Sequence, residues 1–132
     1  MKLITRDTDY ALRAICYIAC SKTKLVSAAE LFKSLKIPRP FLRKILQELD
    51  KKGILKSYKG KGGGFKLAVN PRGIYLLDIM NIFQRPVELN ECLFKKMACP
   101  NIKICLLRRK IEDIEDHVLH RLKSITVSSL LR

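Results

Sequence analysis

The chain has 132 residues, with 27 Lys or Arg against 12 Asp or Glu, so its formal net charge is +15. Hydrophobic residues make up 48% of it, which allows one domain with a real core and argues against intrinsic disorder. A domain this basic usually binds a polyanion. Nucleic acid is favoured over a membrane, because no apolar run approaches the roughly 20 residues that a membrane span requires.

The expected compartment decides how the cysteines are interpreted. Residues 1–5 lack the apolar core of a signal peptide. We therefore expect a cytoplasmic protein, in which disulfides are uncommon. The odd number of cysteines, five, then suggests metal binding, redox chemistry or plain packing instead of a disulfide framework.

Two helices are predicted in the first third of the chain, over residues 7–20 and 27–35. The buried stripe of the first consists of Ala11, Ala14, Ile15 and Ile18. Cys16 and Cys20 are four residues apart and share a face roughly opposite that stripe, where they either meet a partner subunit or are simply tolerated. The second helix begins with a capping box formed by Ser27 and Glu30.

A one-faced basic helix and a glycine-rich hairpin come next. The apolar stripe of the helix is Leu42, Ile45, Leu46 and Leu49. Pro38 and Pro40 suit its first turn, and Gly53 suits its end. Residues 54–58 and 65–69 are then predicted as two short strands. With the preceding helix, this order predicts a winged helix-turn-helix, which is a reader of duplex DNA.

The outward face of the basic helix supplies the candidate DNA-binding residues Arg39, Arg43, Lys44 and Gln47. Arg39 and Arg43 lie near the start of the helix, where side chains reach deepest into the groove, and arginine pairs bidentately with guanine. Gln47 suits adenine. The alternative is an ordinary solvated basic surface, which the capped preceding helix, the turn and the glycine hairpin argue against.

The tip of the hairpin adds four candidate residues, Lys59, Lys61, Gly62 and Gly63. We expect the two lysines to lie along the phosphate backbone or to enter the minor groove. The glycines let the backbone come close to the DNA.

The second half of the chain is predicted as a short apolar helix at residues 74–83, an irregular loop and a long helix at 104–124. The long helix carries apolar residues at the three-four spacing of a coiled-coil seam, interrupted by Arg121: Ile104, Leu107, Ile111, Ile114, Val118 and Ile125. We predict that it pairs with the same helix of a second copy. The alternative is an amphipathic helix that folds back on its own domain.

The predicted fold class is therefore mainly α, with three regions. Residues 1–83 form the winged helix-turn-helix DNA-binding domain. Residues 84–103 form a cysteine-bearing sensor loop, and residues 104–132 form a dimerisation helix and tail.

Three cysteines form a second constellation in and beside the predicted loop. Cys92, Cys99 and Cys105 are separated by six and five residues. Thiolates so grouped in an intracellular chain can hold an iron–sulfur cluster or zinc. Three packed or idle thiols are an equally good explanation of the spacing alone.

The chain resembles the Rrf-two family of bacterial transcription regulators over essentially its whole length. The resemblance is carried by residues 1–3, residues 10–14, the hairpin run 60–65 and the three cysteines. It implies a homodimer of winged helix domains held by the long C-terminal helices. It also implies an iron–sulfur cluster, two-iron or four-iron, on Cys92, Cys99 and Cys105, as in the IscR-like and NsrR-like branches, where the cluster state sets DNA affinity.

The sequence departs from these branches at Arg108, in the Cys92–Cys99 interval and at Arg43. It matches the NsrR-like branch at Asp9. IscR-like members carry a histidine three positions beyond the last cysteine, where this chain has Arg108. Asp9 matches the place from which NsrR-like members supply a carboxylate ligand to the other subunit, although it is also an ordinary first-turn acid. The interval between Cys92 and Cys99 is one residue longer than in many relatives. Arg43 replaces their glutamate or glutamine, so the operator sequence should differ.

The sequence thus predicts a homodimeric, sequence-specific DNA-binding regulator, a repressor or an activator, whose cluster senses nitric oxide, redox state or iron supply. One alternative is a cluster-free member that answers to thiol oxidation or to a partner protein. Another is a zinc-stabilised RNA-binding protein. An enzyme lacks support, because His117 and His120 lie in the long helix without a nucleophile or a cleft signal.

Overall fold

The computed structural model describes residues 2–22, 25–85 and 105–131. The elements in chain order are helices α1 (Arg6–Cys20), α2 (Ala28–Leu35) and α3 (Arg39–Lys51), strands β1 (Leu55–Tyr58) and β2 (Gly64–Leu67), a 3-10 turn η1 (Pro71–Gly73), and helices α4 (Leu76–Phe83), α5 (Leu106–Lys123) and α6 (Val127–Leu130). The described chain is mainly α with one small antiparallel hairpin, as predicted.

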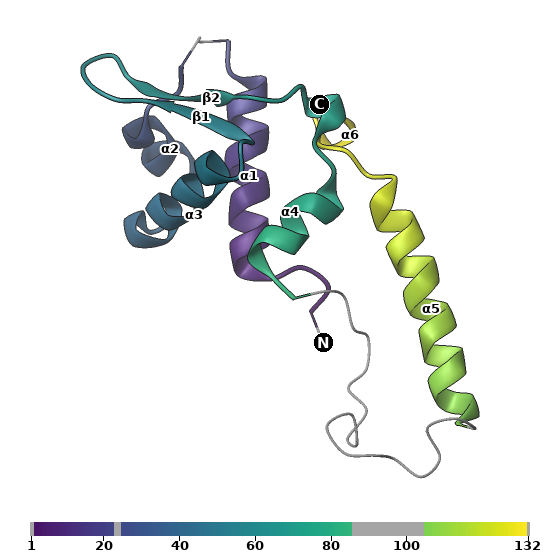
Figure 1. Ribbon diagram of the computed structural model, residues 1–132. Coiled ribbons are helices and arrows are strands. Elements are labelled where there is room, and N and C mark those ends of the chain that lie inside the picture. The colour runs from purple at the N-terminus through teal and green to yellow at the C-terminus, as the bar shows by residue number, and fades with distance from the viewer. Residues whose placement is uncertain (1, 23–24, 86–104, 132) are drawn as a thin grey trace.

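Helix α1 runs through the centre of the molecule, with α2 and α3 on one side and α4 on the other (Figure 1). Its predicted stripe is confirmed, because Ala11, Ala14, Ile15 and Ile18 are all buried. They pack against the predicted stripe of α3, which is also buried throughout: Leu42, Ile45, Leu46 and Leu49. Two matched apolar stripes therefore hold α3 with its polar side facing outward.

Helix α2 begins where the capping signal placed it. The backbone N–H of Glu30 donates to Ser27 Oγ at 3.1 Å. The Glu30 carboxylate accepts a hydrogen bond from the Tyr17 hydroxyl of α1 at 3.0 Å. The cap therefore fixes the start of α2 and also ties it to α1.

The hairpin is held to the body by a short pairing beside β2. Val26 and Phe65 exchange backbone hydrogen bonds of 2.9 and 2.8 Å, so the chain before α2 lies antiparallel to β2. The hairpin tip extends beyond α2 and α3 (Figure 1). The strands are shorter than the predicted 54–58 and 65–69, but the predicted pairing is correct.

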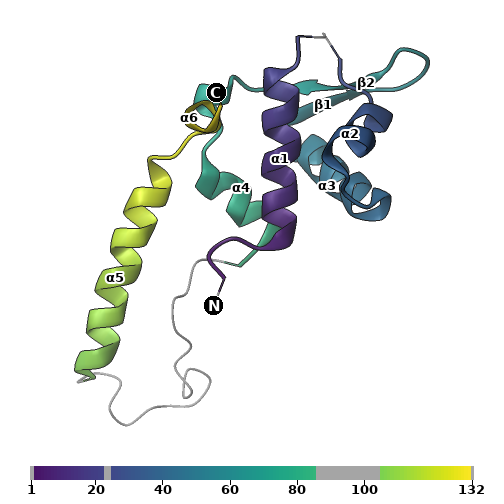
Figure 2. The same cartoon turned by 180° about the vertical axis from the view of Figure 1, so that it is seen from behind.

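The tail of the chain returns to the body and fixes one end of α5. Tyr75 and Thr126 form a backbone bridge, and Val127 is fully buried in the main core. This pairing also explains why α4 begins at Leu76 and not at the predicted residue 74, since the preceding residues are extended against the tail. From that anchor, α5 leans away from α1 and α4 in both views (Figures 1 and 2).

The predicted helix at 104–124 corresponds to α5. The predicted sensor loop lies outside the described residues apart from Gln84 and Arg85, and so do Cys92 and Cys99. No helix in the described part of the chain is long and apolar enough to cross a membrane.

Candidate nucleic-acid interface

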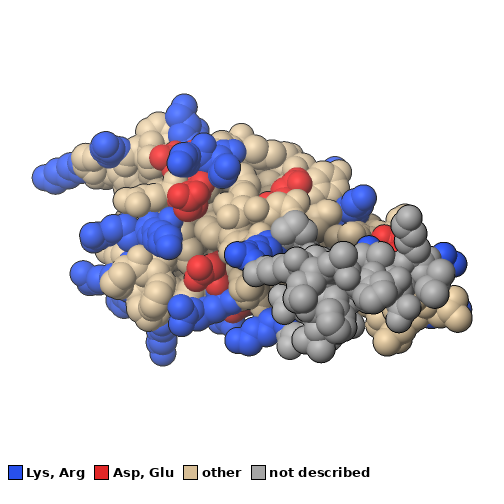
Figure 3. Space-filling model, turned by 60° about the horizontal axis from the view of Figure 1, so that its bottom comes forward, with Lys and Arg blue, Asp and Glu red and all other residues tan. Residues whose placement is uncertain are grey.

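The polar face of α3 presents the four candidates from this helix together. Arg39, Arg43, Lys44 and Gln47 are all exposed, while the opposite face of the helix is buried. Lys and Arg side chains gather over the end of the molecule formed by α2, α3 and the hairpin (Figure 3). The structure thus brings the predicted helix residues onto one basic surface, with few carboxylates among them.

Two arginines near the start of α3 lie against aromatic rings. The guanidinium carbon of Arg39 is 5.2 Å from the centroid of the Phe32 ring in α2. Arg6, at the start of α1, lies 4.4 Å from the centroid of Phe41 in the first turn of α3. Such stacking restricts an arginine without using its hydrogen-bond donors. Sequence reasoning missed Arg6, because it is distant from α3 in the chain.

The glycines of the hairpin tip are required by the backbone itself. Gly60 and Gly62 have φ of 93° and 80°, in the left-handed region. A Cβ on Gly63 would collide with the Tyr58 carbonyl oxygen, and one on Gly64 would lie 2.6 Å from the Val26 carbonyl oxygen. These glycines therefore close the hairpin and let it pair with residue 26, which is a reason independent of DNA.

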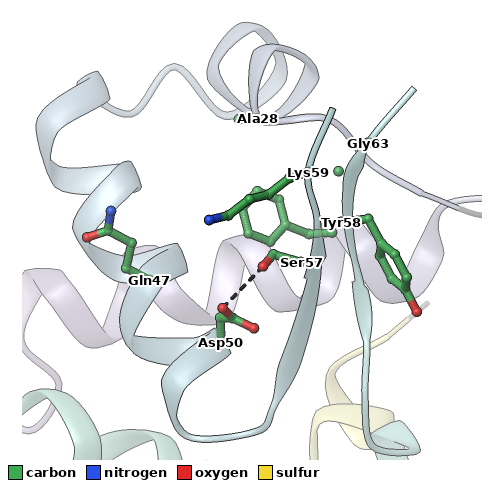
Figure 4. A pocket seen from close by; sticks show the side chains of 9 residues that line it. Ala28, Gln47, Asp50, Ser57, Tyr58, Lys59 and Gly63 are labelled. Carbon is green, nitrogen blue, oxygen red and sulfur yellow. Dashed lines mark hydrogen bonds between the residues drawn. The ribbon is translucent and has the colours of Figure 1, made fainter. Parts of the chain in front are cut away.

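A groove of about 490 Å³ separates α3 from the hairpin. Gln47 lines it from α3, Lys59 from the hairpin and Phe65 from β2. Lys59 extends across the groove toward α3, and Ser57 Oγ donates to Asp50 Oδ2 at 3.2 Å (Figure 4). This hydrogen bond holds the hairpin at a set distance from α3. Lys61 and Gly62 are exposed at the hairpin tip.

The outer face of the hairpin carries a basic cluster that sequence reasoning missed. Lys56 and Lys66 are cross-strand partners, and their amines lie 5.5 and 5.3 Å from the centroid of the Tyr58 ring. The hydrogen bond from Lys66 lowers the pKa of the exposed Tyr58 phenol, and the positive charge of Lys56 acts in the same direction. Tyr58 points away from α3 (Figure 4), so this cluster and the α3 surface face different ways.

Of the four candidate metal ligands, the structure describes Cys105 and Asp9. Cys105 is the half-buried N-cap of α5, and its sulfur accepts from the backbone N–H of Arg108 at 3.4 Å. Asp9 Oδ2 lies 3.0 Å from Arg13 Nε on α1. Within the described ranges, no three His, Cys, Asp or Glu side chains are grouped so that they could hold a metal ion.

Cys16 and Cys20 have different surroundings although they are close in sequence. Cys16 is partly buried and packs against the core, whereas Cys20 is exposed. Burial raises the pKa of the Cys16 thiol, and the neighbouring Cys20 raises it further. Cys16 therefore acts as a small apolar side chain.

Sequence comparison assigns the chain to a family. The model of the Rrf2 (Rrf-two) family, described as an iron-dependent transcriptional regulator, matches residues 4–132. A protein of Aquifex aeolicus, described as an HTH-type transcriptional regulator, is 36% identical over 132 residues, which cover 98% of this chain and 92% of that protein. The NsrR regulator of Shouchella clausii is 30% identical over 130 residues, with coverages of 97% and 87%. The chain belongs to the Rrf2 family of helix-turn-helix transcriptional regulators.

The fold is confirmed by comparison with solved structures. The global cysteine regulator CymR of Bacillus subtilis matches with a TM-score of 0.77 at 24% identity, covering 98% of this chain and 96% of that one. The winged helix-turn-helix prediction is therefore correct. A family of transcriptional regulators also favours this function over an enzyme and over the RNA-binding alternative.

Proposed function

We propose that the chain is a homodimeric regulator that binds a specific DNA operator and changes its affinity with the state of an iron–sulfur cluster. We place it in the cytoplasm, where thiols stay reduced. The observation that carries the DNA-binding part is the single surface formed by the exposed side of α3 and the tip of the hairpin.

The α3 side chains and the hairpin have different roles in this proposal. Arg43 and Gln47 read base edges in the major groove, because both lie on the exposed face of α3. Arg39 also reads base edges, with its guanidinium beside the Phe32 ring. Lys44 binds a phosphate of the DNA backbone. Lys59 lines the groove between α3 and the hairpin, where the sugar–phosphate backbone would pass between the two. Lys61, Gly62 and Gly63 at the hairpin tip follow the adjacent backbone or minor groove.

The dimer is proposed to form through α5. Leu107 and Ile114 on the predicted seam are 67% and 48% exposed. Among the described residues, the last turns of α5 pack on the chain's own body, where Leu122 is buried with Leu76 and Met80. A second copy of α5 would cover the exposed leucine and isoleucine, because monomeric proteins rarely leave such a stripe in water. Two protomers would then present their α3 helices about one helical turn, roughly 34 Å, apart.

The described residues fit one end of a cluster site. Cys105 caps α5, and its sulfur accepts from the backbone N–H of Arg108 in the first turn. Thiolate is the form of cysteine that binds metal. Cys92 and Cys99 would supply two further thiolates and Asp9 of the partner subunit the fourth ligand. Asp9 would have to exchange its contact with Arg13, which is solvent-exposed and therefore weak. When bound, the cluster would supply a redox- and nitric-oxide-reactive centre.

A second candidate within the family is a cluster-free regulator that responds through thiol oxidation or a partner protein. It is favoured by the likeness to CymR, a global cysteine regulator, and by the ion pair that already occupies Asp9. The two candidates share the DNA surface and the dimer, so only the chemistry at the cysteines separates them.

Anaerobic purification tests the proposal. We expect visible absorbance with stoichiometric iron and sulfide, a change on addition of nitric oxide, and loss of colour without unfolding in Cys99→Ala. The Cys20→Ala variant is the matched control and should keep its colour. A colourless wild-type protein without iron or sulfide would reject the cluster and leave the cluster-free regulator. Zinc without visible absorbance would also reject it.

A further inference from the structure

The carboxamide of Gln84 holds the start of α1. The Thr8 hydroxyl donates to Gln84 Oε1 at 2.7 Å, and the backbone N–H of Thr5 donates to the same oxygen at 3.2 Å. Gln84 Nε2 donates to the Leu3 carbonyl oxygen at 3.0 Å. One side chain thus binds three residues that are 76 to 81 positions away in the sequence.

The contact with Thr8 is the most protected part of this arrangement. Thr8 is fully buried, so its hydroxyl has the Gln84 oxygen as a partner where a lost hydrogen bond would be costly. Thr5 is the N-cap of α1. The backbone N–H of Gln84 donates to the Met80 carbonyl oxygen and ends α4. The residue therefore joins the end of one helix to the first turn of another.

The first turn of α1, which Gln84 holds, contacts α3 directly. Arg6 follows Thr5 in the chain, and its guanidinium lies over the ring of Phe41 in the first turn of α3. Phe41 precedes Arg43 by two residues. On the other side, Gln84 precedes Cys92 by only eight residues. In the described part of the chain, a series of contacts thus runs from Gln84 through Thr5 and Arg6 to α3.

We propose that Gln84 is a positioning residue that couples the state of the cysteines to the placement of α3. A change in the chain beyond Gln84 alters how its amide holds Thr5 and Thr8. The first turn of α1 then shifts, and Arg6 moves Phe41 with it. This inference rests on the proposed function, and it adds a residue that neither binds the cluster nor touches DNA.

The test compares operator affinity in cluster-loaded and cluster-free protein for the wild type and for Gln84→Met, which keeps the length of the side chain and loses its hydrogen bonds. Coupling of this kind corresponds to about 5- to 150-fold in affinity. For the wild type, we expect the operator affinities of cluster-loaded and cluster-free protein to differ by a factor in that range. For Gln84→Met, we expect the two affinities to agree to within about twofold, with iron content unchanged. Gln84→Glu keeps the acceptor for Thr5 and Thr8 and should retain most of the affinity difference.

Hydrogen exchange in cluster-free protein gives a second readout. Amides in the first turn of α1 should exchange faster in Gln84→Met and in Thr8→Val than in the wild type. Asn70→Leu, which removes an amide that caps η1, is the control and should leave α1 unchanged.

The outcomes separate the two proposals. If the operator affinity of the wild type does not depend on the cluster, the proposed cluster switch is wrong. Amide hydrogen exchange then still shows whether Gln84 stabilises the first turn of α1. If the wild type responds and Gln84→Met responds equally, the coupling role of Gln84 is wrong and the proposed function stands. If the affinity difference disappeared in Gln84→Glu as completely as in Gln84→Met, the proposed role of the Thr5 and Thr8 contacts would also be wrong.

Discussion

The backbone N–H of Val127 donates to the Ile74 carbonyl oxygen at 2.8 Å, and this pairing anchors the C-terminal end of α5. Leu76 and Ile125 add a second bond of 2.9 Å beside it. Since the tail after α5 is fixed to the body, the N-terminal half of the helix is left to project with its apolar stripe exposed. The apolar surface that α5 offers to the proposed second copy is therefore set by where the tail pairs.

Charge on the α5 stripe should separate the proposed dimer. The Leu107→Glu/Ile114→Glu double variant should sediment as a folded monomer, because both side chains are largely exposed in the single chain and their burial against a partner would bury two carboxylates. His120→Glu, on the far side of α5, should remain a dimer. A dimer of unchanged stability in the double variant would contradict the proposed interface. Analytical ultracentrifugation and circular dichroism give both readouts.

Removal of Arg43 should relax sequence discrimination more than it lowers general affinity. The Arg43→Ala variant should lose about 1–3 kcal/mol of discrimination at one base pair, which is the usual value of a bidentate contact. Binding to duplexes from an operator selection, each with single base changes, measures this loss. Lys123→Ala, at the end of α5, is the control and should bind like the wild type. Equal weakening on all sequences would assign Arg43 to phosphate instead.

Lys59→Ala should show the opposite behaviour. If Lys59 contacts phosphate from the groove beside α3, its loss should weaken binding to all duplexes alike. It should also reduce the slope of log affinity against log salt by about 0.9, the value for one phosphate contact on duplex DNA. Titrations at several salt concentrations with an operator and a scrambled duplex provide the measurement. An unchanged slope would place Lys59 away from the DNA.

Two glycines near the hairpin should differ in their tolerance of a side chain. Gly63→Ala places a methyl group against the Tyr58 carbonyl oxygen. Overpacking of this kind typically costs about 1–3 kcal/mol, so the melting temperature should fall by several degrees. In Gly73→Ala, the nearest atom is a Val69 methyl carbon at 3.4 Å, and the variant should melt like the wild type. Equal melting temperatures would show that the hairpin tip adapts freely.

The two thiols of α1 should react in a fixed order. Because burial raises the pKa of Cys16, a smaller fraction of it is thiolate at any pH below that pKa, and thiolate is the reactive form. Iodoacetamide at pH 8 should therefore modify exposed Cys20 before Cys16, and raising the pH should speed modification of Cys16. Peptide mass spectrometry follows both sites. Denatured protein, in which the two should react alike, is the control.

The sequence by itself determined the helices of the DNA-binding domain and the outward residues of α3. These follow from local rules: Leu42, Ile45, Leu46 and Leu49 recur at the helical period, and Ser27 caps α2 as its side chain allows. Family resemblance pointed to the same fold through the glycine hairpin. The cluster, its ligands and the dimer stay predictions.

Only the tertiary structure decided which distant residues meet. No periodicity indicates that Gln84 would bind Thr8, that Arg6 would lie on Phe41, or that the tail would pair beside Ile74 and shift the start of α4. The physical reason is that periodicity and capping report on neighbours within about one or two turns, whereas these contacts join segments brought together when the apolar stripes pack. The coupling proposed for Gln84 depends on contacts of that second kind.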